Sequence, residues 1–281
     1  MADAFTVLAS LCLPKIFLIQ HDCGHGSFFK SKWANDVMGS LCGILSLTPY
    51  YYWRKTHAIH HASSGNLERR GIGDVVTLTV SEYRERTRWG RLTYRLYRNP
   101  VVIFLIGPMY LFFIQFRLPL SESRDWPRER ASVWFTNVGA SAVAVGLYAA
   151  FGTTGLLVAF LIAAMAAPVA VWLVYVQHQF EDAYWASDED WDFESAALKG
   201  STYYKLPAVL QWITTNIGFH HVHHLSPRIP NYRLQACHEA NPALQQVPVL
   251  TLGSSFRTIF LKLWDEEQNK LVSFREATRS G

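Results

Sequence analysis

The stretch Phe219-His220-His221-Val222-His223-His224 holds four histidines in five consecutive positions, and the rest of the chain is organised around it. If the stretch is helical, His220, His223 and His224 stand at positions i, i+3 and i+4, so their three imidazoles share one face. Imidazole is a good ligand for Fe, Zn, Cu and Ni. The spacing therefore predicts a metal site on this face.

The histidines elsewhere in the chain repeat this grouping. They occur as His57-x-x-His60-His61, as His21-Asp22-Cys23-Gly24-His25 and as His178, so that only His238 lies outside a group. A structural zinc takes four protein ligands and a catalytic zinc takes three, so eight or nine histidines are too many for one metal. They suit two metals with open positions for a small molecule. Neutral nitrogen ligands with open positions favour redox iron, because calcium and magnesium prefer oxygen ligands.

Several residues near these groups have more than one interpretation. His221 lies about 100° around the helix from His220, so we expect a supporting or surface role rather than metal ligation. Asn216 stands one turn before His220 and could hold a water or a ligand, or cap a helix. A metal-bound histidine usually donates its second N–H to a carboxylate or carbonyl. The candidate carboxylates are Asp22, Asp74, Glu181 and Asp182, each of which could instead be a surface charge.

Taken together, the three histidine groups resemble the three histidine boxes of the membrane fatty acid desaturases, most closely the delta-12 acyl-lipid type of plants and bacteria. The flanking residues support this resemblance. They are HDCGHGSFF at 21–29, Trp53-Arg54 before the second group, VQHQFE at 176–181 and NIGFHHVHHLSPRIPNYRL at 216–234. The resemblance covers about residues 16–235.

The resemblance implies two non-haem iron ions. The ligands that it implies are His21, His25, His57, His60, His61, His178, His220, His223 and His224. His178 matches the extra histidine that the family contributes from outside its boxes, and no catalytic residue separate from the ligands is expected. The implied reaction is the dioxygen-dependent insertion of a cis double bond into a fatty acyl chain, and the expected substrate is an acyl chain carried by a membrane lipid. A separate ferredoxin-like or cytochrome b5-like protein is expected to donate two electrons.

Composition indicates a membrane protein with large polar parts. Half of the 281 residues are apolar and only 17% are charged, compared with about 25% in an average soluble protein. The net charge of +4 gives no reason to expect a nucleic-acid partner. The four cysteines form no CxxC motif, so neither a disulfide framework nor a thiolate metal site is expected. No basic segment begins the chain, so a signal peptide is not expected.

The apolar segments predict one all-α domain over residues 1–281, an integral membrane bundle with a cytoplasmic, histidine-rich di-iron cap. Spans are expected at about 4–20, 133–151 and 156–177, with the uncharged turn Gly152-Thr153-Thr154-Gly155 on the external side. Segments 37–53 and 101–116 are expected to be interfacial or re-entrant. Segment 37–53 joins two histidine groups that must reach the same metals, so it is not expected to cross the membrane fully. Segment 101–116 has arginines on both flanks, so both of its ends are expected on the cytoplasmic side. The cap is expected at 54–98 and 178–281.

A basic segment lies within the expected cap. Six arginines fall in residues 84–98, interleaved with Trp89, Leu92 and Leu96. This pattern predicts a helix on the anionic cytoplasmic membrane surface or a docking site for an acidic electron carrier, and a solvated helix face is the alternative.

Two alternatives to a desaturase are left open. A lipid hydroxylase, acetylenase or ketolase could use the same histidine boxes. A non-catalytic membrane protein that binds metal through its histidines would hold them inside its spans, whereas here they stand at helix ends and in polar segments. The family usually has a further hydrophobic hairpin before the first box. Only twenty residues precede His21, so a truncated or shortened member is expected.

Overall fold

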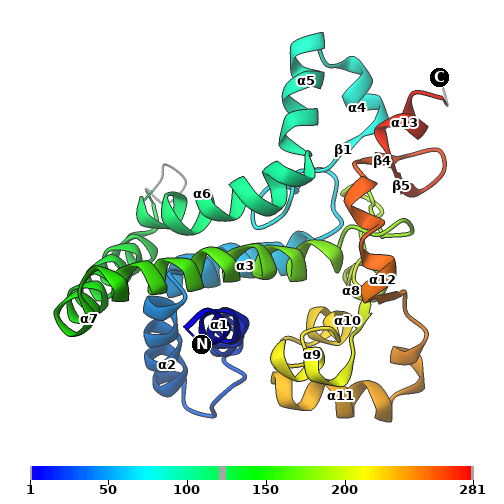
Figure 1. The fold of residues 1–281 in the computed structure, drawn as a ribbon. Helices are drawn as coiled ribbons and strands as arrows, with labels where there is room; N and C mark the ends of the chain where they lie inside the picture. The colour runs from blue at the N-terminus through cyan, green and yellow to red at the C-terminus, as the bar shows by residue number, and fades with distance from the viewer. Residues whose placement is uncertain (1, 120–124, 280–281) are drawn as a thin grey trace. The chain divides into compact units, whose positions relative to one another are not determined.

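The structure is a computed structural model that describes residues 2–119 and 125–279, and it is mainly helical, as predicted (Figure 1). The chain divides into two compact units. Unit 1 comprises residues 1–56, 104–171 and 213–215, and unit 2 comprises residues 57–103, 172–212 and 216–281.

Unit 1 is helical. Its elements are α1 (Ala2–His25), α2 (Lys32–Leu45), the first half of α3 (Tyr50–Ser63), α6 (Gly107–Phe113), the 3-10 turn η2 (Gln115–Arg117) and most of α7 (Pro127–Val176). A π-helical turn, η1 (Val102–Ile106), leads into α6. This irregular turn lies where Pro108, at the start of α6, has no backbone N–H to offer.

Close packing at two glycines joins α1, α2 and the start of α3 within unit 1. A Cβ on Gly39 would overlap the ring of Tyr50, and a Cβ on Gly43 would overlap the carbonyl oxygen of Thr48. The Tyr50 hydroxyl donates a hydrogen bond to the carbonyl oxygen of Cys23 at 2.8 Å. These contacts fix the C-terminal end of α1, where the first histidine group lies.

Helix α7 reverses its direction at Gly152, whose φ of 62° and ψ of −154° are not helical. A Cβ on Gly155 would lie 2.9 Å from the carbonyl oxygen of Leu147. Residues eight apart in a continuous helix are separated by about 12 Å along its axis, so the chain must fold back here. Glycine at 152 allows this because it adopts positive φ without steric cost. The reversal falls in the stretch where the sequence predicts a turn.

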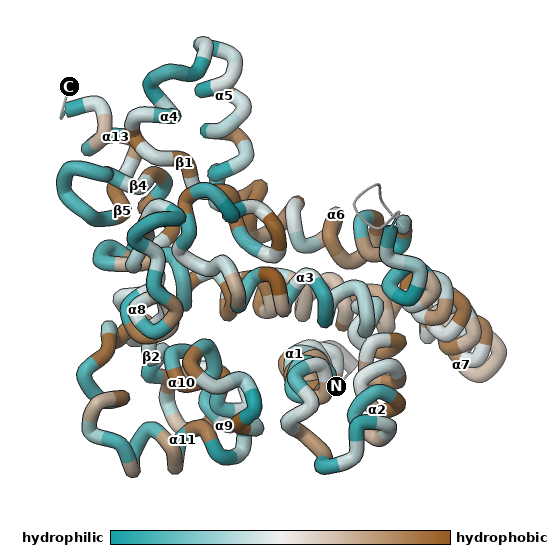
Figure 2. The backbone as a smooth tube through the Cα atoms, turned by 180° about the vertical axis from the view of Figure 1, so that it is seen from behind, coloured by the Kyte–Doolittle hydropathy of each residue, from teal (hydrophilic) through white to brown (hydrophobic). Residues whose placement is uncertain are grey.

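Apolar residues run along α7 and remain exposed. Val138, Val145 and Phe151 are between 67% and 70% exposed, and the helix is coloured mainly brown in Figure 2. Among the described residues, α7 is the single helix long and apolar enough to cross a membrane, and residues 88–97 joined to 102–117 pass the same test as a bent pair. The spans at 4–20, 133–151 and 156–177 stay predictions.

Unit 2 combines short helices with short strands. The helices are α4 (Val80–Glu85), α5 (Arg88–Tyr97), α8 (Phe193–Lys199), α9 (Ala208–Ile213), α10 (His220–Leu225), α11 (Asn231–Ala240), α12 (Leu252–Ser255) and α13 (Phe274–Ala277), with 3-10 turns η4 (Pro242–Gln245) and η5 (Thr258–Phe260). The strands are β1 (Leu78–Thr79), β2 (Tyr203–Lys205), β3 (Val249–Thr251), β4 (Leu263–Asp265) and β5 (Lys270–Val272).

The strands form two small sheets that the all-α prediction did not include. In the first sheet, of order β1-β4-β5, β1 is parallel to β4 and β4 is antiparallel to β5, with Leu263 paired to both Leu78 and Val272. In the second sheet, β2 and β3 are parallel. Strands of two or three residues are too short to show the period-two alternation by which a strand is recognised in a sequence.

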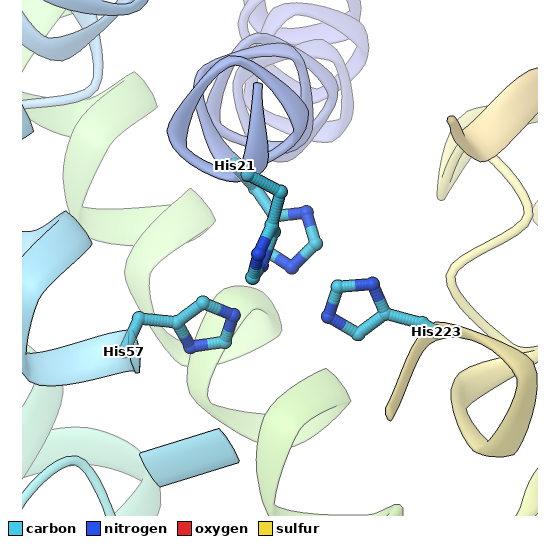
Figure 3. Close-up of side chains that lie close together, drawn as sticks. His21, His57 and His223 are labelled. Carbon is cyan, nitrogen blue, oxygen red and sulfur yellow. The ribbon is translucent and has the colours of Figure 1, made fainter. Parts of the chain in front are cut away.

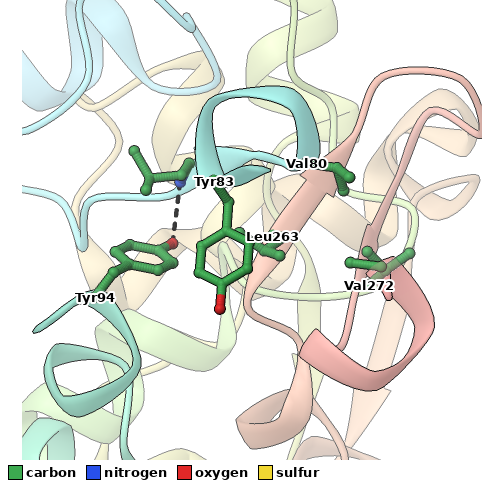
Figure 4. Packing of buried hydrophobic residues seen from close by; sticks show 7 residues of the cluster. Val80, Tyr83, Tyr94, Leu263 and Val272 are labelled. Atoms are coloured by element: carbon green, nitrogen blue, oxygen red, sulfur yellow. Dashed lines mark hydrogen bonds between the residues drawn. The ribbon is translucent and has the colours of Figure 1, made fainter. Parts of the chain in front are cut away.

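The first sheet carries one of the hydrophobic clusters of unit 2. Leu78, Leu263 and Val272 pack there with Tyr83 and Tyr94, all of them buried (Figure 4). The Tyr94 hydroxyl accepts a hydrogen bond from the backbone N–H of Leu78 at 3.0 Å and donates one to the carbonyl oxygen of Lys262 at 2.8 Å. These bonds attach α5 to the sheet.

Candidate metal centre

Unit 2 by itself brings seven histidines together from three parts of the chain. The second half of α3 supplies three, the turn that follows α7 supplies one, and α10 supplies three. They are His57, His60, His61, His178, His220, His223 and His224. Because α10 is helical, three of its imidazoles share one face, as the spacing predicted. Figure 3 shows the rings of His57 and His223 directed toward one another.

The Nε2 atoms of these histidines form two short chains. In the first chain, Nε2 of His61 lies 3.1 Å from Nε2 of His57 and 2.9 Å from Nε2 of His223. In the second chain, Nε2 of His220 lies 2.9 Å from Nε2 of His178 and 3.1 Å from Nε2 of His224. Two imidazole nitrogens bound at right angles to one metal, at about 2.1 Å each, are about 3.0 Å apart. The spacing within each chain therefore fits neighbouring ligands of a metal ion.

His60 lies beside the second series of Nε2 contacts, which joins His178, His220 and His224. The possible ligand atoms of His60, His178 and His224 all lie within 4.8 Å of one another. All three side chains are buried, with residue exposures of 2% to 8%. Unit 2 therefore holds two groups of imidazole nitrogens, one around each series of Nε2 contacts, that could each hold a metal ion.

Oxygen atoms close to the second ring nitrogen, Nδ1, orient two of these rings. Nδ1 of His178 lies 3.0 Å from the carbonyl oxygen of Gly200, which can only accept a hydrogen bond. The proton of the neutral ring is therefore on Nδ1, and the lone pair of Nε2 is left for a metal. Nδ1 of His60 lies 2.8 Å from Oδ1 of Asp74, and this carboxylate favours a proton on Nδ1 of His60 as well. Carbonyl and carboxylate partners of this kind are typical of metal-bound histidines.

The charges of the site favour neutral imidazoles. Burial, aided by the neighbouring His60, lowers the pKa of His178 to about 4. Burial and the surrounding histidines hold the pKa of His224 well below its usual value. Burial acts to raise the pKa of Asp74, but the adjacent His60 outweighs it and keeps that pKa below its usual value. At neutral pH the rings of His178 and His224 are thus in the form that binds metal, with the Asp74 carboxylate in the same site.

The first histidine group lies in unit 1, at the end of α1. The rings of His21 and His25 are one helical turn apart, with centroids separated by 4.8 Å, and their possible ligand atoms also lie within 4.8 Å of each other. Nδ1 of His21 is 3.1 Å from Oδ1 of Asp22. Burial raises the pKa of the Cys23 thiol to about 12.

His221 lies apart from both chains of histidines. It is fully buried, and its Nε2 lies 3.1 Å from Nδ1 of His238, the one histidine outside the sequence groups. Burial, aided by His238, lowers the pKa of His221 to about 4. The Asn216 amide donates to the carbonyl oxygen of Asn231 at 3.2 Å, and no side-chain hydrogen bond caps α10, so Asn216 is not the cap of this helix.

The four candidate carboxylates differ in position. Asp22 and Asp74 contact histidines, whereas Asp182 is exposed and Glu181 is a surface residue whose Oε1 lies 3.5 Å from Nζ of Lys270. The sequence did not single out the carbonyl of Gly200 or the His221–His238 pair. No local spacing signals them, because each joins residues at least seventeen positions apart.

A small pocket occurs in each unit within the described part of the chain. In unit 2, about 260 Å³ of empty space lies against Asp74, His178 and Gly200. In unit 1, about 330 Å³ lies between α1, α6 and α7 and is lined almost entirely by apolar side chains. Its lining residues are Leu13, Pro14, Phe17, Ser46, Leu47, Phe112, Ala163, Ala166, Ala167 and Ala170.

Comparisons with known proteins place all these histidines inside one matched region. The profile of the family described as fatty acid desaturase matches residues 2–251. The fatty acid desaturase of Bacillus subtilis (strain 168) is 47% identical over 273 residues, which cover 97% of this chain and 77% of that protein.

More distant relatives have more specific names. The sn-1 acyl-lipid omega-3 desaturase (ferredoxin) of Synechocystis sp. is 32% identical over 251 residues, which cover 84% of this chain and 66% of that protein. The Delta(12)-fatty-acid desaturase of Arabidopsis thaliana is 28% identical over 260 residues, which cover 84% of this chain and 63% of that protein.

Proposed function

The chain belongs to the fatty acid desaturase family, and from this premise we propose that it is a membrane di-iron oxidoreductase that desaturates acyl chains carried by lipids. The observation that carries the proposal is the pair of Nε2 chains in unit 2, whose spacings of 2.9–3.1 Å suit neighbouring ligands of a metal. Dioxygen chemistry at an unactivated methylene requires such a centre, because no protein side chain alone supplies the oxidant.

The proposed ligands are the nine histidines of the sequence resemblance, including His21 and His25 from unit 1. All-imidazole sites suit iron and leave the metal with open positions, provided that each iron takes four or five of the nine. His178 and His60 are held for this role by the Gly200 carbonyl and the Asp74 carboxylate. His221 is not among the proposed ligands, because its ring faces His238.

The proposed reaction removes one hydrogen from each of two adjacent methylenes. An acyl –CH2–CH2– unit, one dioxygen, two electrons and two protons give –CH=CH– and two waters. When bound, iron supplies the reduction of dioxygen that this oxidation needs. The residues of the chain hold the centre in a buried site and keep His178 and His224 neutral, while the Gly200 carbonyl and the Asp74 carboxylate favour a proton on Nδ1 of His178 and of His60.

The apolar pocket of unit 1 is the proposed binding site for part of the acyl chain. Its small side chains, four of them alanines on α7, leave room where larger ones would fill it. An acyl chain has no polar group to be satisfied along its length, so apolar walls are sufficient and a polar wall would be costly.

Electrons come from a separate protein in this proposal. The name of the Synechocystis relative includes ferredoxin, and a ferredoxin-like or cytochrome b5-like donor is proposed here. The two arms of α7 are proposed to cross the membrane, with 152–155 outside and the histidines on the cytoplasmic side.

Expression in a host without desaturases tests the proposal, with the double bonds of the total fatty acids located by mass spectrometry. We expect new unsaturated acyl chains and about two irons per folded chain after anaerobic purification. Hydroxylated, acetylenic or keto products would assign the chain to a related lipid oxidation instead. Folded protein that holds one metal or fewer at full occupancy would contradict the di-iron centre.

A further inference from the structure

Helix α5 exposes apolar side chains on its outer face, in addition to the residues that it buries on its inner face. Its inner face carries Tyr94, which is 5% exposed, and continues to Arg98, which is fully buried. The outer face carries Trp89, Leu92 and Leu96, which are 76%, 43% and 55% exposed. At about 100° per residue, these three residues cluster on the side of the helix opposite to Tyr94. We call them the outer stripe.

Polar contacts inside unit 2 fix this orientation. The Arg98 guanidinium donates to the Gln179 side-chain oxygen at 2.7 Å, to the Thr77 hydroxyl at 2.9 Å and to three further oxygens, on Val76, Leu261 and Tyr175. Turning α5 to hide the outer stripe would break these bonds and those of Tyr94. A buried cation stripped of its hydrogen bonds is far more costly than an exposed leucine.

The surroundings of the outer stripe are cationic. Residues 84–98 hold six arginines and one acidic residue, Glu85. Arg86 and Arg88 are exposed, with Arg88 on the flank of the outer stripe. The chain then continues into an apolar run whose first residue, Val101, is 59% exposed. Exposed tryptophan and leucine bordered by arginines are the composition of a helix that lies in a membrane interface.

We propose that α5 binds the headgroup layer of a bilayer that contains anionic phospholipid, with the outer stripe in the apolar edge of that layer. A bilayer satisfies both halves of the surface, since it offers hydrocarbon to Trp89, Leu92 and Leu96 and phosphate to the arginines. An acidic electron carrier would use the charges but leave the stripe without an apolar partner of its own. A second copy of the chain would bring arginines against arginines. The proposal does not depend on the reaction that the chain catalyses.

Site-directed labelling of the full chain in nanodiscs tests this contact. A cysteine is placed at Leu92 of the outer stripe or, as the matched control, at Gln268 in the exposed turn between β4 and β5 of the same unit. Both variants are made in a background in which the two accessible cysteines are replaced, Cys12→Ser with Cys237→Ser. Each cysteine carries a fluorophore, and the quencher is a nitroxide-bearing phospholipid. We expect several-fold stronger quenching at position 92 than at 268.

The charge dependence is measured on the same label. Quenching at position 92 should be stronger in phosphatidylglycerol with phosphatidylcholine than in phosphatidylcholine alone, and the joint change Arg86→Gln with Arg88→Gln should remove this difference. Both arginines are exposed, so the fold should survive, which circular dichroism checks. Equal, weak quenching at 92 and 268 in both lipids would overturn the proposal. Shielding of position 92 only when an acidic iron–sulfur ferredoxin is added would also overturn it and would identify a protein dock.

Discussion

Lys262 offers a sharp test of how unit 2 is held together. Its side chain is 5% exposed, and its Nζ has no hydrogen-bond partner within residues 2–119 and 125–279. Burial, with a further contribution from the positive charge of Arg98, lowers the pKa of Lys262 from 10.5 to about 7. Lys262→Met keeps a long flexible side chain and removes the ammonium group, so we expect it to stabilise the protein.

The size of this effect follows from the two pKa values. Because the folded pKa is the lower one, the unfolded chain binds more protons between pH 7 and pH 10.5, and stability rises with pH across that window. Below pH 7 the full cost of a buried ammonium is present, which is about 5 kcal/mol at about 1.4 kcal/mol for each unit of difference. The same arithmetic leaves about 2 kcal/mol at pH 9.

The measurement is thermal unfolding of the purified protein in detergent at pH 6 and pH 9. We expect Lys262→Met to raise Tm by about 5–15 °C at pH 6, with a clearly smaller gain at pH 9. Lys205→Met is the matched control, because Lys205 is an exposed lysine of β2 in the same unit, and its Tm should change little. A Tm that falls in Lys262→Met, or a gain that is equal at both pH values, would show that Lys262 is not a buried, unpaired cation.

Four further predictions concern the proposed function. His178→Ala should abolish desaturation and lower the iron content of inserted protein, whereas His221→Ala should keep most of the iron and measurable activity; reversed results would mean that the ligand set is wrong by one residue. Asp74→Asn should weaken iron binding by about 10–100-fold in competition with a chelator, and unchanged binding would leave the His60 contact without a role. A cysteine at Thr153 should react with an impermeant thiol reagent added from the external side, and reaction only from the cytoplasmic side would reverse the topology. Ala167→Leu, which adds bulk to the pocket of unit 1, should shift the products toward shorter acyl chains in the fatty acid profile, and an unchanged chain-length distribution would remove this pocket from the acyl path.

The sequence determined the family and the local geometry of each histidine group. The spacing i, i+3, i+4 is a property of one helical turn, so the shared face of His220, His223 and His224 could be read without a tertiary structure. The resemblance to the desaturases is confirmed by the family profile and the relatives. The reversal of α7 was also visible, since two glycines interrupt a long apolar run at 152 and 155.

The tertiary structure decided which groups meet. The contact of His60 with Asp74, of His178 with Gly200 and of His221 with His238 joins residues that are fourteen to twenty-two positions apart, and no local pattern encodes such pairings. The short strands formed for the same reason, because two or three residues become a strand only when a distant segment supplies the hydrogen bonds. Local spacing therefore defined the available ligands, and the packing of unit 2 determined how seven of them converge.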